Sequence, residues 1–362
     1  MAIGASPAGL AAVLPERLND SNWDVYRSAQ SPRALIDFYE DDPLVRTTHD
    51  SFEAGLKRYA DRECMGTRAP PPGREPYVWH TYKQVAEARA NLGSALRGRG
   101  IFKGDAVGLY MVNRLEWAVA ELACSAMGIV SVPLYDTLGA DVVEYICNHA
   151  NLKAVVCSTN ELAKLMPVVP KTNVKLVVVA PEHTLMSDKA LPVCPSADVV
   201  HYSVMLSEGA QNPREFTPGD ADDVATVCYT SGTTGLPKGA LITHRNLVSN
   251  AASCERRMMV GKTDPDTIDT HISYLPLAHI YERLALVSNL HRGVRCGFFR
   301  GDMLKLLDDI AELRPTCFSS VPRLFNRIYD GVSTRANARV HVDVGFVPSA
   351  APSLVCCIGF KS

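Results

Sequence analysis

The residues best suited to chemistry lie in one run, YTSGTTGLPKG, from Tyr229 to Gly239. Its glycines allow sharp backbone turns that expose consecutive N–H groups, and its hydroxyls and single lysine add further donors and a fixed positive charge. The glycines are Gly232, Gly235 and Gly239; the hydroxyl residues are Thr230, Ser231, Thr233 and Thr234; the lysine is Lys238. Such a run predicts a loop that cradles phosphate groups.

The flanks of this run predict how it is held. The stretch 225–228 (ATVC) has the pattern of a buried strand entering the loop, and 240–243 (ALIT) that of a strand leaving it. A Walker-type loop would continue directly into a helix and would carry Ser or Thr after its lysine, whereas Gly239 follows Lys238 here. The alternative is a Gly/Thr-rich hairpin connection that binds no ligand. Two features oppose it: hairpin loops are usually shorter, and they rarely need four hydroxyl residues.

At these residues the chain resembles the signature loop of the AMP-forming acyl-CoA synthetases, in the adenylate-forming ligase superfamily. Other stretches are similar to the long-chain fatty-acid branch: VPLYDTLG (132–139), YLPLAHIYER (274–283), GFFRGD (297–302) and VPRLFNRIYD (321–330). The opening, 14–68, resembles the plant peroxisomal members. The resemblance covers residues 14 to 332.

The resemblance implies a two-step reaction, in which ATP activates a long-chain fatty acid as an acyl-adenylate and coenzyme A then displaces AMP. It implies ATP and Mg²⁺ as cofactors and coenzyme A as co-substrate. We assign the triphosphate to the loop and a catalytic role to Lys238, because the loop's donors can stabilise the charge that moves onto pyrophosphate. The assigned loop residues are Thr230, Ser231, Gly232, Thr233, Thr234, Gly235 and Lys238; no residue is assigned to a metal.

His279 is the second catalytic candidate. It lies between Pro276 and an expected helix at 280–291, where a lone histidine is most often a helix cap. The resemblance favours a catalytic role, because YLPLAH is similar to the motif whose His or aromatic residue lies beside the acyl carboxylate. Glu282 and Arg283 also fall in that motif, but a surface ion pair explains them equally well, so we leave them out of the catalytic set. The arginines between 314 and 339 make a basic stretch, for which we favour a solvated helix face over contact with the phosphates of a nucleotide or CoA.

Strand and helix signals alternate along the chain and predict an α/β fold: the incomplete large N-terminal domain of an adenylate-forming ligase, with mostly parallel sheets and crossover helices. We expect a lead-in segment at 1–75 and a first α/β subdomain at 76–206. The start of a second subdomain, with the phosphate loop, is expected at 207–332, and a tail outside the family at 333–362. Thr81 followed by Gln84 is a capping-box signal for a helix start.

The composition excludes several classes of protein. Hydrophobic residues make up 47% of the chain and its net charge is −2, which predicts a globular fold without the basic footprint of a nucleic-acid binder. The 11 cysteines form no CxxC pair, which argues against a disulfide framework and a zinc site. The first residues lack the basic start of a signal peptide, and the longest apolar region, 118–135, contains Glu121 and Pro133, so any membrane contact must be peripheral. Peroxisome and endoplasmic reticulum both stay open as locations, and so does the oligomeric state.

The family pattern is interrupted after residue 332. The YGxTE-like motif, the ribose-binding Asp and the small C-terminal domain of the family are not found in this sequence. We therefore expect the front part of a ligase joined to an unrelated end, as a truncated gene model or a splice variant would produce. Two alternatives to an active long-chain ligase remain: an inactive fragment that at most binds nucleotide phosphates, and another adenylate-forming enzyme of the aryl-CoA ligase type.

Overall fold

The strands between residues 106 and 243 form one sheet, and most of them are connected by helices. The computed structural model describes residues 4–5, 11–17, 24–29, 31, 34–68, 76–183, 190–230, 236–257 and 268–339. Within this part, a seven-stranded sheet has the order β10-β9-β8-β6-β7-β11-β12, and every neighbouring pair is parallel except β11 with β12. Its strands are β6 (Ala106–Tyr110), β7 (Val130–Leu134), β8 (Leu152–Ser158), β9 (Leu176–Ala180), β10 (Asp198–His201), β11 (Val224–Thr230) and β12 (Lys238–Thr243).

Helices connect these strands over both faces of the sheet. They are α3 (Leu115–Met127), α4 (Ala140–His149), α5 (Thr159–Leu165) and α6 (Tyr202–Gln211), with a short 3₁₀ turn at Val169–Lys171. The strand order reverses at β6: β7 lies on one side of it and β8 on the other. In open α/β sheets, ligands bind at the carboxyl ends of the strands beside such a reversal.

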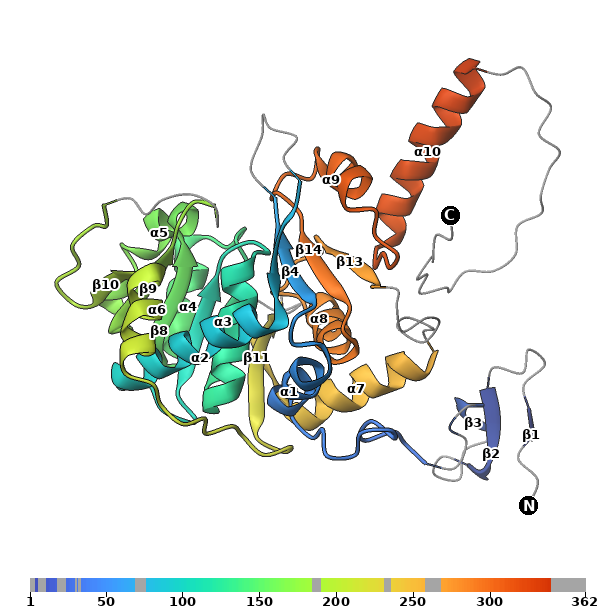
Figure 1. Cartoon of the computed structure of the whole chain (residues 1–362), viewed down its shortest axis with the longest axis horizontal. Coiled ribbons are helices and arrows are strands. Elements are labelled where there is room, and N and C mark those ends of the chain that lie inside the picture. Colours follow the sequence, from blue (N-terminus) through green and yellow to red (C-terminus); the bar gives the residue numbers. More distant parts are fainter. Residues whose placement is uncertain are drawn as a thin grey trace.

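A second sheet combines the beginning and the end of the described chain. It has four strands in the order β13-β14-β4-β5, formed by β4 (Glu63–Thr67), β5 (Val78–Thr81), β13 (Thr270–Ser273) and β14 (Arg295–Phe298). The remaining helices are α1 (Thr48–Tyr59), α2 (Tyr82–Gly98), α7 (His244–Arg257), α8 (Ile280–Arg292), α9 (Leu306–Leu313) and α10 (Pro322–Arg339), of which α10 extends away from the sheets in Figure 1. A separate antiparallel sheet contains β1 (Gly4–Ala5), β2 (Ala11–Arg17) and β3 (Asp24–Ser28).

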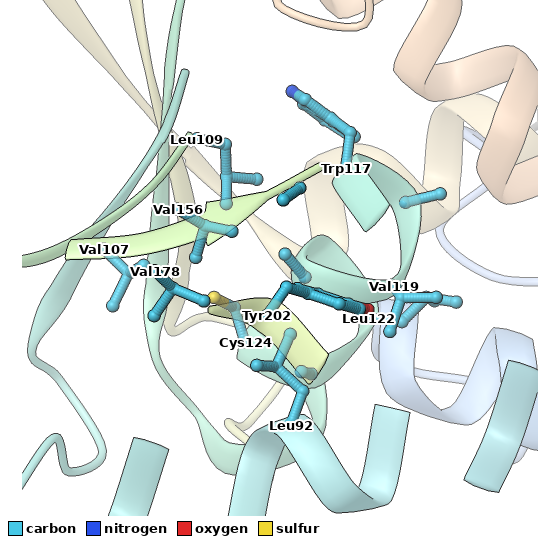
Figure 2. Close-up of a cluster of buried hydrophobic side chains, with 14 of the residues drawn as sticks. Leu92, Val107, Leu109, Trp117, Val119, Leu122, Cys124, Val156, Val178 and Tyr202 are labelled. Carbon is cyan, nitrogen blue, oxygen red and sulfur yellow. The ribbon is translucent and has the colours of Figure 1, made fainter. Parts of the chain in front are cut away.

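The cores show how the layers are stacked. One cluster joins side chains of α2, α3 and α6 to the face of the seven-stranded sheet that carries Val107, Val156 and Val178, as Figure 2 shows. The same cluster continues through α1 and α8 to Met65 and Phe298 of the four-stranded sheet. A second cluster packs α4 and α5 on the opposite face of the seven-stranded sheet, and another packs α9 and α10 near β13. The two sheets therefore share one layer of helices and carry further helices on their outer faces.

These observations confirm the expected fold class, α/β with mostly parallel sheets. The capping box is also confirmed: Thr81 Oγ1 accepts from Gln84 N at 3.2 Å, and Gln84 Oε1 accepts from Thr81 N at 2.8 Å. The helix expected at 280–291 is α8, which ends at Gly293 with a left-handed φ of 75°.

Strand pairing crosses the expected boundaries at 75 and 206, which stay predictions. The lead-in range contains α1 and β4, and β4 belongs to the same sheet as β13 and β14. Helix α6 runs across the boundary at 206, and β11 and β12 complete the sheet of the preceding range. Strand pairing between distant segments is set by tertiary packing, which local patterns do not report. The tail from 340 onward lies outside the described residues.

Candidate functional site

The two ends of the predicted phosphate loop lie side by side. Strands β11 and β12 pair antiparallel, and their register places Thr230 opposite Lys238, both exposed. Thr230 and Lys238 therefore lie together at one end of the hairpin. Ser231, Gly232, Thr233, Thr234 and Gly235 lie outside the described residues.

Tyr229 anchors this hairpin to the sheet. Its ring is buried, and its hydroxyl lies 2.6 Å from Nδ1 of His149 at the end of α4. Burial raises the pKa of the Tyr229 hydroxyl to about 12, so this group stays protonated. Gly239 is paired with Tyr229, and a Cβ there would lie 2.8 Å from Val227 Cγ1. A larger residue at 239 would press on Val227 and Tyr229. Gly239 therefore has a packing role inside β12 and not the turn role expected from the sequence.

A pocket lies at the carboxyl ends of strands from both sheets. Its volume is about 440 Å³, and its walls come from the chain just after β6, β7, β13 and β14, with one side formed by α10. β11 is parallel to β7, so Thr230 at the carboxyl end of β11 lies at the same end of the strands as Leu134 of the pocket wall. The end of β11 at Thr230 and the pocket therefore lie at the same end of the parallel strands.

Asn113 holds the two halves of this pocket together. Its buried side chain donates to Leu275 O at 2.6 Å and to Ser273 Oγ at 3.0 Å, and its Oδ1 accepts from Leu277 N at 2.8 Å. These bonds fix the segment after β13 against the loop after β6. Sequence reasoning missed Asn113, although a polar residue directly after a buried parallel strand is a signal for a site.

His279 is placed at the start of α8. Its Nδ1 accepts from Tyr281 N at 3.2 Å, so it caps the helix, and its ring is exposed. Its backbone N–H donates to Pro276 O at 2.8 Å, and the preceding residues 274–278 line the pocket. The structure thus brings His279 next to the pocket wall, whereas no hydrogen bond or ion pair between described residues joins it to Lys238.

The interpretation of Glu282 and Arg283 as a surface ion pair is wrong. Both are buried, with 1% and 2% of their surface exposed. Glu282 Oε1 lies 2.9 Å from His271 Nε2, and Arg283 pairs with Glu121. They point in different directions from α8 because adjacent residues on a helix do not face each other.

The basic stretch near the end of the described chain is partly a pocket wall. Arg323 and Arg327, one helical turn apart on α10, are exposed and line the pocket, while Asp136 lines another part of it. The interpretation as a solvated face is therefore incomplete. These two guanidinium groups make one rim of a largely apolar pocket positive.

The described residues also bear on metal binding and membrane insertion. They contain no group of three or more His, Cys, Asp or Glu side chains that could hold a metal ion. None of the helices in the described ranges combines the length and the apolar character needed to cross a bilayer.

Comparison with solved structures supports the fold. The chain matches the adenylation domain of a carboxylic acid reductase from Segniliparus rugosus, solved with AMP and a carboxylic acid, with a TM-score of 0.69 and 22% identity over 81% of this chain and 51% of that one. It matches a long-chain-fatty-acid-CoA ligase from Archaeoglobus fulgidus with a TM-score of 0.65 and 21% identity, covering 80% of this chain and 54% of that one. These neighbours confirm the expected adenylate-forming ligase fold.

Relatives found by sequence share a higher identity with this chain than these solved structures do. The chain is 47% identical over 326 residues to the peroxisomal long chain acyl-CoA synthetase 6 of Arabidopsis thaliana, which covers 90% of this chain and 46% of the relative. It is 44% identical to the peroxisomal synthetase 7 of the same plant, over 89% of this chain and 45% of that protein, and 38% identical to human long-chain-fatty-acid–CoA ligase 1, over 85% and 44%. The chain thus spans less than half the length of these relatives.

A family model described as AMP-binding enzyme matches residues 52–356. This range runs past residue 332, where the expected family segment stops, so the tail boundary stays a prediction. The match covers most of the chain and includes both strands of the hairpin and the pocket walls. The chain therefore belongs to the family of AMP-binding enzymes.

Proposed function

We propose that this chain forms the phosphate-binding and acyl-binding part of a long-chain fatty-acid–CoA ligase. The observation that carries the proposal is the hairpin: the run YTSGTTGLPKG closes between Thr230 and Lys238 at the edge of the sheet where the pocket opens. The likeness to long chain acyl-CoA synthetases named above supports the substrate class.

The loop would hold the triphosphate of ATP. Thr230, Ser231, Thr233 and Thr234 supply hydroxyl donors, Gly232 and Gly235 let backbone N–H groups approach, and Lys238 supplies charge. Charge moves onto pyrophosphate as the α-phosphate is attacked, and preorganised donors stabilise that charge without reorganisation. This gives Lys238 its catalytic role.

The pocket would hold the fatty acyl chain. Its volume of about 440 Å³ lies within the usual range for small-molecule sites, roughly 300–1,000 Å³. Its walls are mostly apolar, with Met111, Leu134 and Leu277 among them, which suits an alkyl chain. His279 follows the wall segment directly, so we place the carboxylate end of the substrate on its side.

The chemistry then has two steps. A carboxylate oxygen of the fatty acid forms a bond to the α-phosphorus while the bond to the β-phosphate oxygen breaks, which releases pyrophosphate. The thiol of coenzyme A next attacks the acyl carbon, loses its proton, and displaces AMP. Positioning and charge stabilisation account for most of the catalysis in such in-line transfers.

Magnesium would accompany the nucleotide phosphates. The described residues provide no metal cluster of their own, and we assign no residue of the chain to the ion. We infer a peripheral location on the peroxisomal membrane, or on the endoplasmic reticulum, because two of the relatives are named peroxisomal. Microscopy of a tagged chain with markers for both organelles tests this inference.

The function is tested with the purified 362-residue chain. Two quantities are measured: ATP binding by calorimetry, and pyrophosphate release with oleate, coumarate or an amino acid as the acid. Oleate-dependent release supports the long-chain ligase, and release with coumarate alone supports the aryl-CoA alternative. Binding without release supports the fragment that only binds nucleotide phosphates.

Lys238→Ala is the critical variant. The rate of any pyrophosphate release should fall by about a hundredfold or more, because one donor that stabilises the transition state is lost. Lys83→Ala, at an exposed lysine in the first turn of α2, is the matched control. Equal ATP binding by the Lys238→Ala variant and the unsubstituted chain would refute the phosphate-loop assignment.

A further inference from the structure

Arg283 is the centre of a buried polar cluster, the Arg283 cluster, formed with Glu121 of α3, Ser131 of β7, and Thr226 and Cys228 of β11. It belongs to none of the motif roles assigned above. Only 2% of the arginine is exposed, and its charge is paired with Glu121. A charged group held this deeply costs free energy unless its partners are well placed.

The contacts of Arg283 reach two neighbouring strands. Its Nη1 donates to Thr226 Oγ1 at 2.8 Å and to Cys228 Sγ at 3.2 Å. Its Nη2 donates to Ser131 Oγ at 3.2 Å and to Glu121 Oε1. The planar fork of a guanidinium group can make these bonds at once, which an ammonium group cannot.

These contacts reinforce the place where β11 joins the parallel sheet. The backbone register between β7 and β11 pairs Ser131 with Thr226. At the same point, Thr226 Oγ1 donates to Ser131 O at 2.8 Å and accepts from Arg283. Side chains therefore add to a short backbone pairing, and Arg283 contributes to both strands.

The position of Arg283 connects this junction to His279 and to the start of the phosphate loop. On α8 it lies four residues, about one helical turn, after His279, the N-cap of that helix. On β11, Cys228 lies two residues, about 7 Å of strand, before Thr230, where the phosphate loop begins. The helix that starts at the pocket wall and the strand that carries the loop thus meet at one guanidinium group.

We propose that Arg283 is a positioning residue that fixes the loop-bearing end of β11 against the helix that begins at His279. Glu121 neutralises the charge of Arg283 and accepts from its Nη2, which keeps the guanidinium group directed at β7 and β11. The functional consequence rests on the proposed function, in which the loop after β11 binds the phosphates of ATP. A misplaced strand end would then weaken phosphate binding although Arg283 touches no phosphate.

The test uses Arg283→Lys in the whole chain, with Arg89→Lys as its matched control. Arg89 is also buried and pairs with a glutamate, Glu53, but it lies on α2 and packs against Phe52 and Phe216, away from β11. A double variant, Arg283→Met with Glu121→Gln, removes both charges and serves if the lysine variant does not fold. Circular dichroism and denaturation confirm that each protein is folded at the assay temperature.

Two measurements distinguish positioning from simple stability. Affinity for magnesium ATP should fall about tenfold or more in Arg283→Lys, since hydrogen bonds to a charged group are lost, and should change by less than about threefold in Arg89→Lys. Amide hydrogen exchange should rise in residues 226–230 of β11 in the Arg283 variants and stay unchanged in β8 and β9. Unchanged exchange in β11 would overturn the proposal, and so would unchanged affinity in a chain that binds ATP.

The same data separate this inference from the proposed function. If the unsubstituted chain does not bind ATP, the phosphate-loop assignment fails, and the exchange of β11 alone decides the role of Arg283. If the unsubstituted chain binds ATP but β11 exchanges equally in all variants, the assignment stands and the positioning role is rejected.

Discussion

Strands β9 and β13 are both fully buried, yet they are buried by different means. β9 reads LVVVA and packs apolar side chains on both faces of the seven-stranded sheet. β13 reads THIS, and three of its four side chains are polar. Thr270 Oγ1 accepts from Arg295 Nε at 2.8 Å, His271 pairs with Glu282, and Ser273 accepts from Asn113. β9 is held by continuous apolar packing, whereas β13 depends on polar partners from distant segments.

The difference extends to the ends of the strands. Just after β4 and β14, Arg68 and Arg300 are both buried at their side chains and share the carboxylates of Asp308 and Asp309 on α9. This pairing attaches α9 to the four-stranded sheet. Apolar packing spreads its contribution to the free energy of folding over many contacts. A buried charge network concentrates that contribution in a few groups, and the loss of one of them leaves a charge unpaired.

Asp309→Asn should therefore give the largest effect. The Asp309 carboxylate is 0% exposed and accepts from Arg300 Nε at 2.7 Å, Arg300 N at 3.0 Å and Arg68 Nη1 at 3.1 Å. Removing its charge leaves two buried arginines undercompensated and should lower the free energy of unfolding by about 3–5 kcal/mol. Urea denaturation measures this, with exposed Asp61→Asn as the control at less than about 0.5 kcal/mol. A loss below about 1 kcal/mol would contradict the contrast between the sheets.

His244 is a buried titratable group at the edge of the apolar sheet, directly after β12. Its Nδ1 lies 3.0 Å from Thr48 Oγ1, and burial lowers its pKa to about 4. The unfolded chain binds a proton near pH 6.5, so the folded state loses stability as pH falls from about 6.5 to about 4, by on the order of 3 kcal/mol in total. The Asp223, Glu121 and Asp50 carboxylates oppose this shift, but burial outweighs them.

The measurement is the free energy of unfolding of the wild type and His244→Asn between pH 4 and 7. The asparagine oxygen can still accept from the Thr48 backbone N–H but does not titrate in this range. The variant should therefore show a flatter decline with acid than the wild type. Equal slopes in both proteins would show that other groups cause the acid sensitivity.

Much of the seven-stranded sheet could be predicted from the sequence, because its signals are local. Helix α3 begins and ends where its pattern predicts, at Leu115 and Met127, and the Thr81 capping box marks α2. The four-stranded sheet could not be derived in this way. β4 and β14 become neighbours across more than 200 residues, and no local pattern encodes such a pairing.

The candidate site shows the same division. Lys238 and His279 stand out from the sequence because their motifs are local, although their roles stay predictions. Asn113 and Arg283 could not be identified in this way, since their importance depends on partners such as Leu277 and Thr226, more than 50 positions away. A polar residue next to another charge looks like a surface pair until burial is known.

Gly209 gives the smallest of the expected effects and tests the packing of helices on the seven-stranded sheet. Gly209 lies beyond the expected boundary at 206, and α6 continues through it to Gln211. A Cβ at Gly209 would lie 1.7 Å from Asn91 O of α2, so Gly209→Ala must push two helices apart and should cost about 1–3 kcal/mol.

Gly98→Ala is the matched control, because nothing lies within 4 Å of its Cβ position, and it should stabilise α2 by up to about 1 kcal/mol. Because the strain of Gly209→Ala is steric in origin, its cost should not change between low and high salt, unlike that of exposed charges. Equal effects of the two alanines in urea denaturation would mean that α2 and α6 do not approach closely, and the apolar half of the comparison would lose its basis.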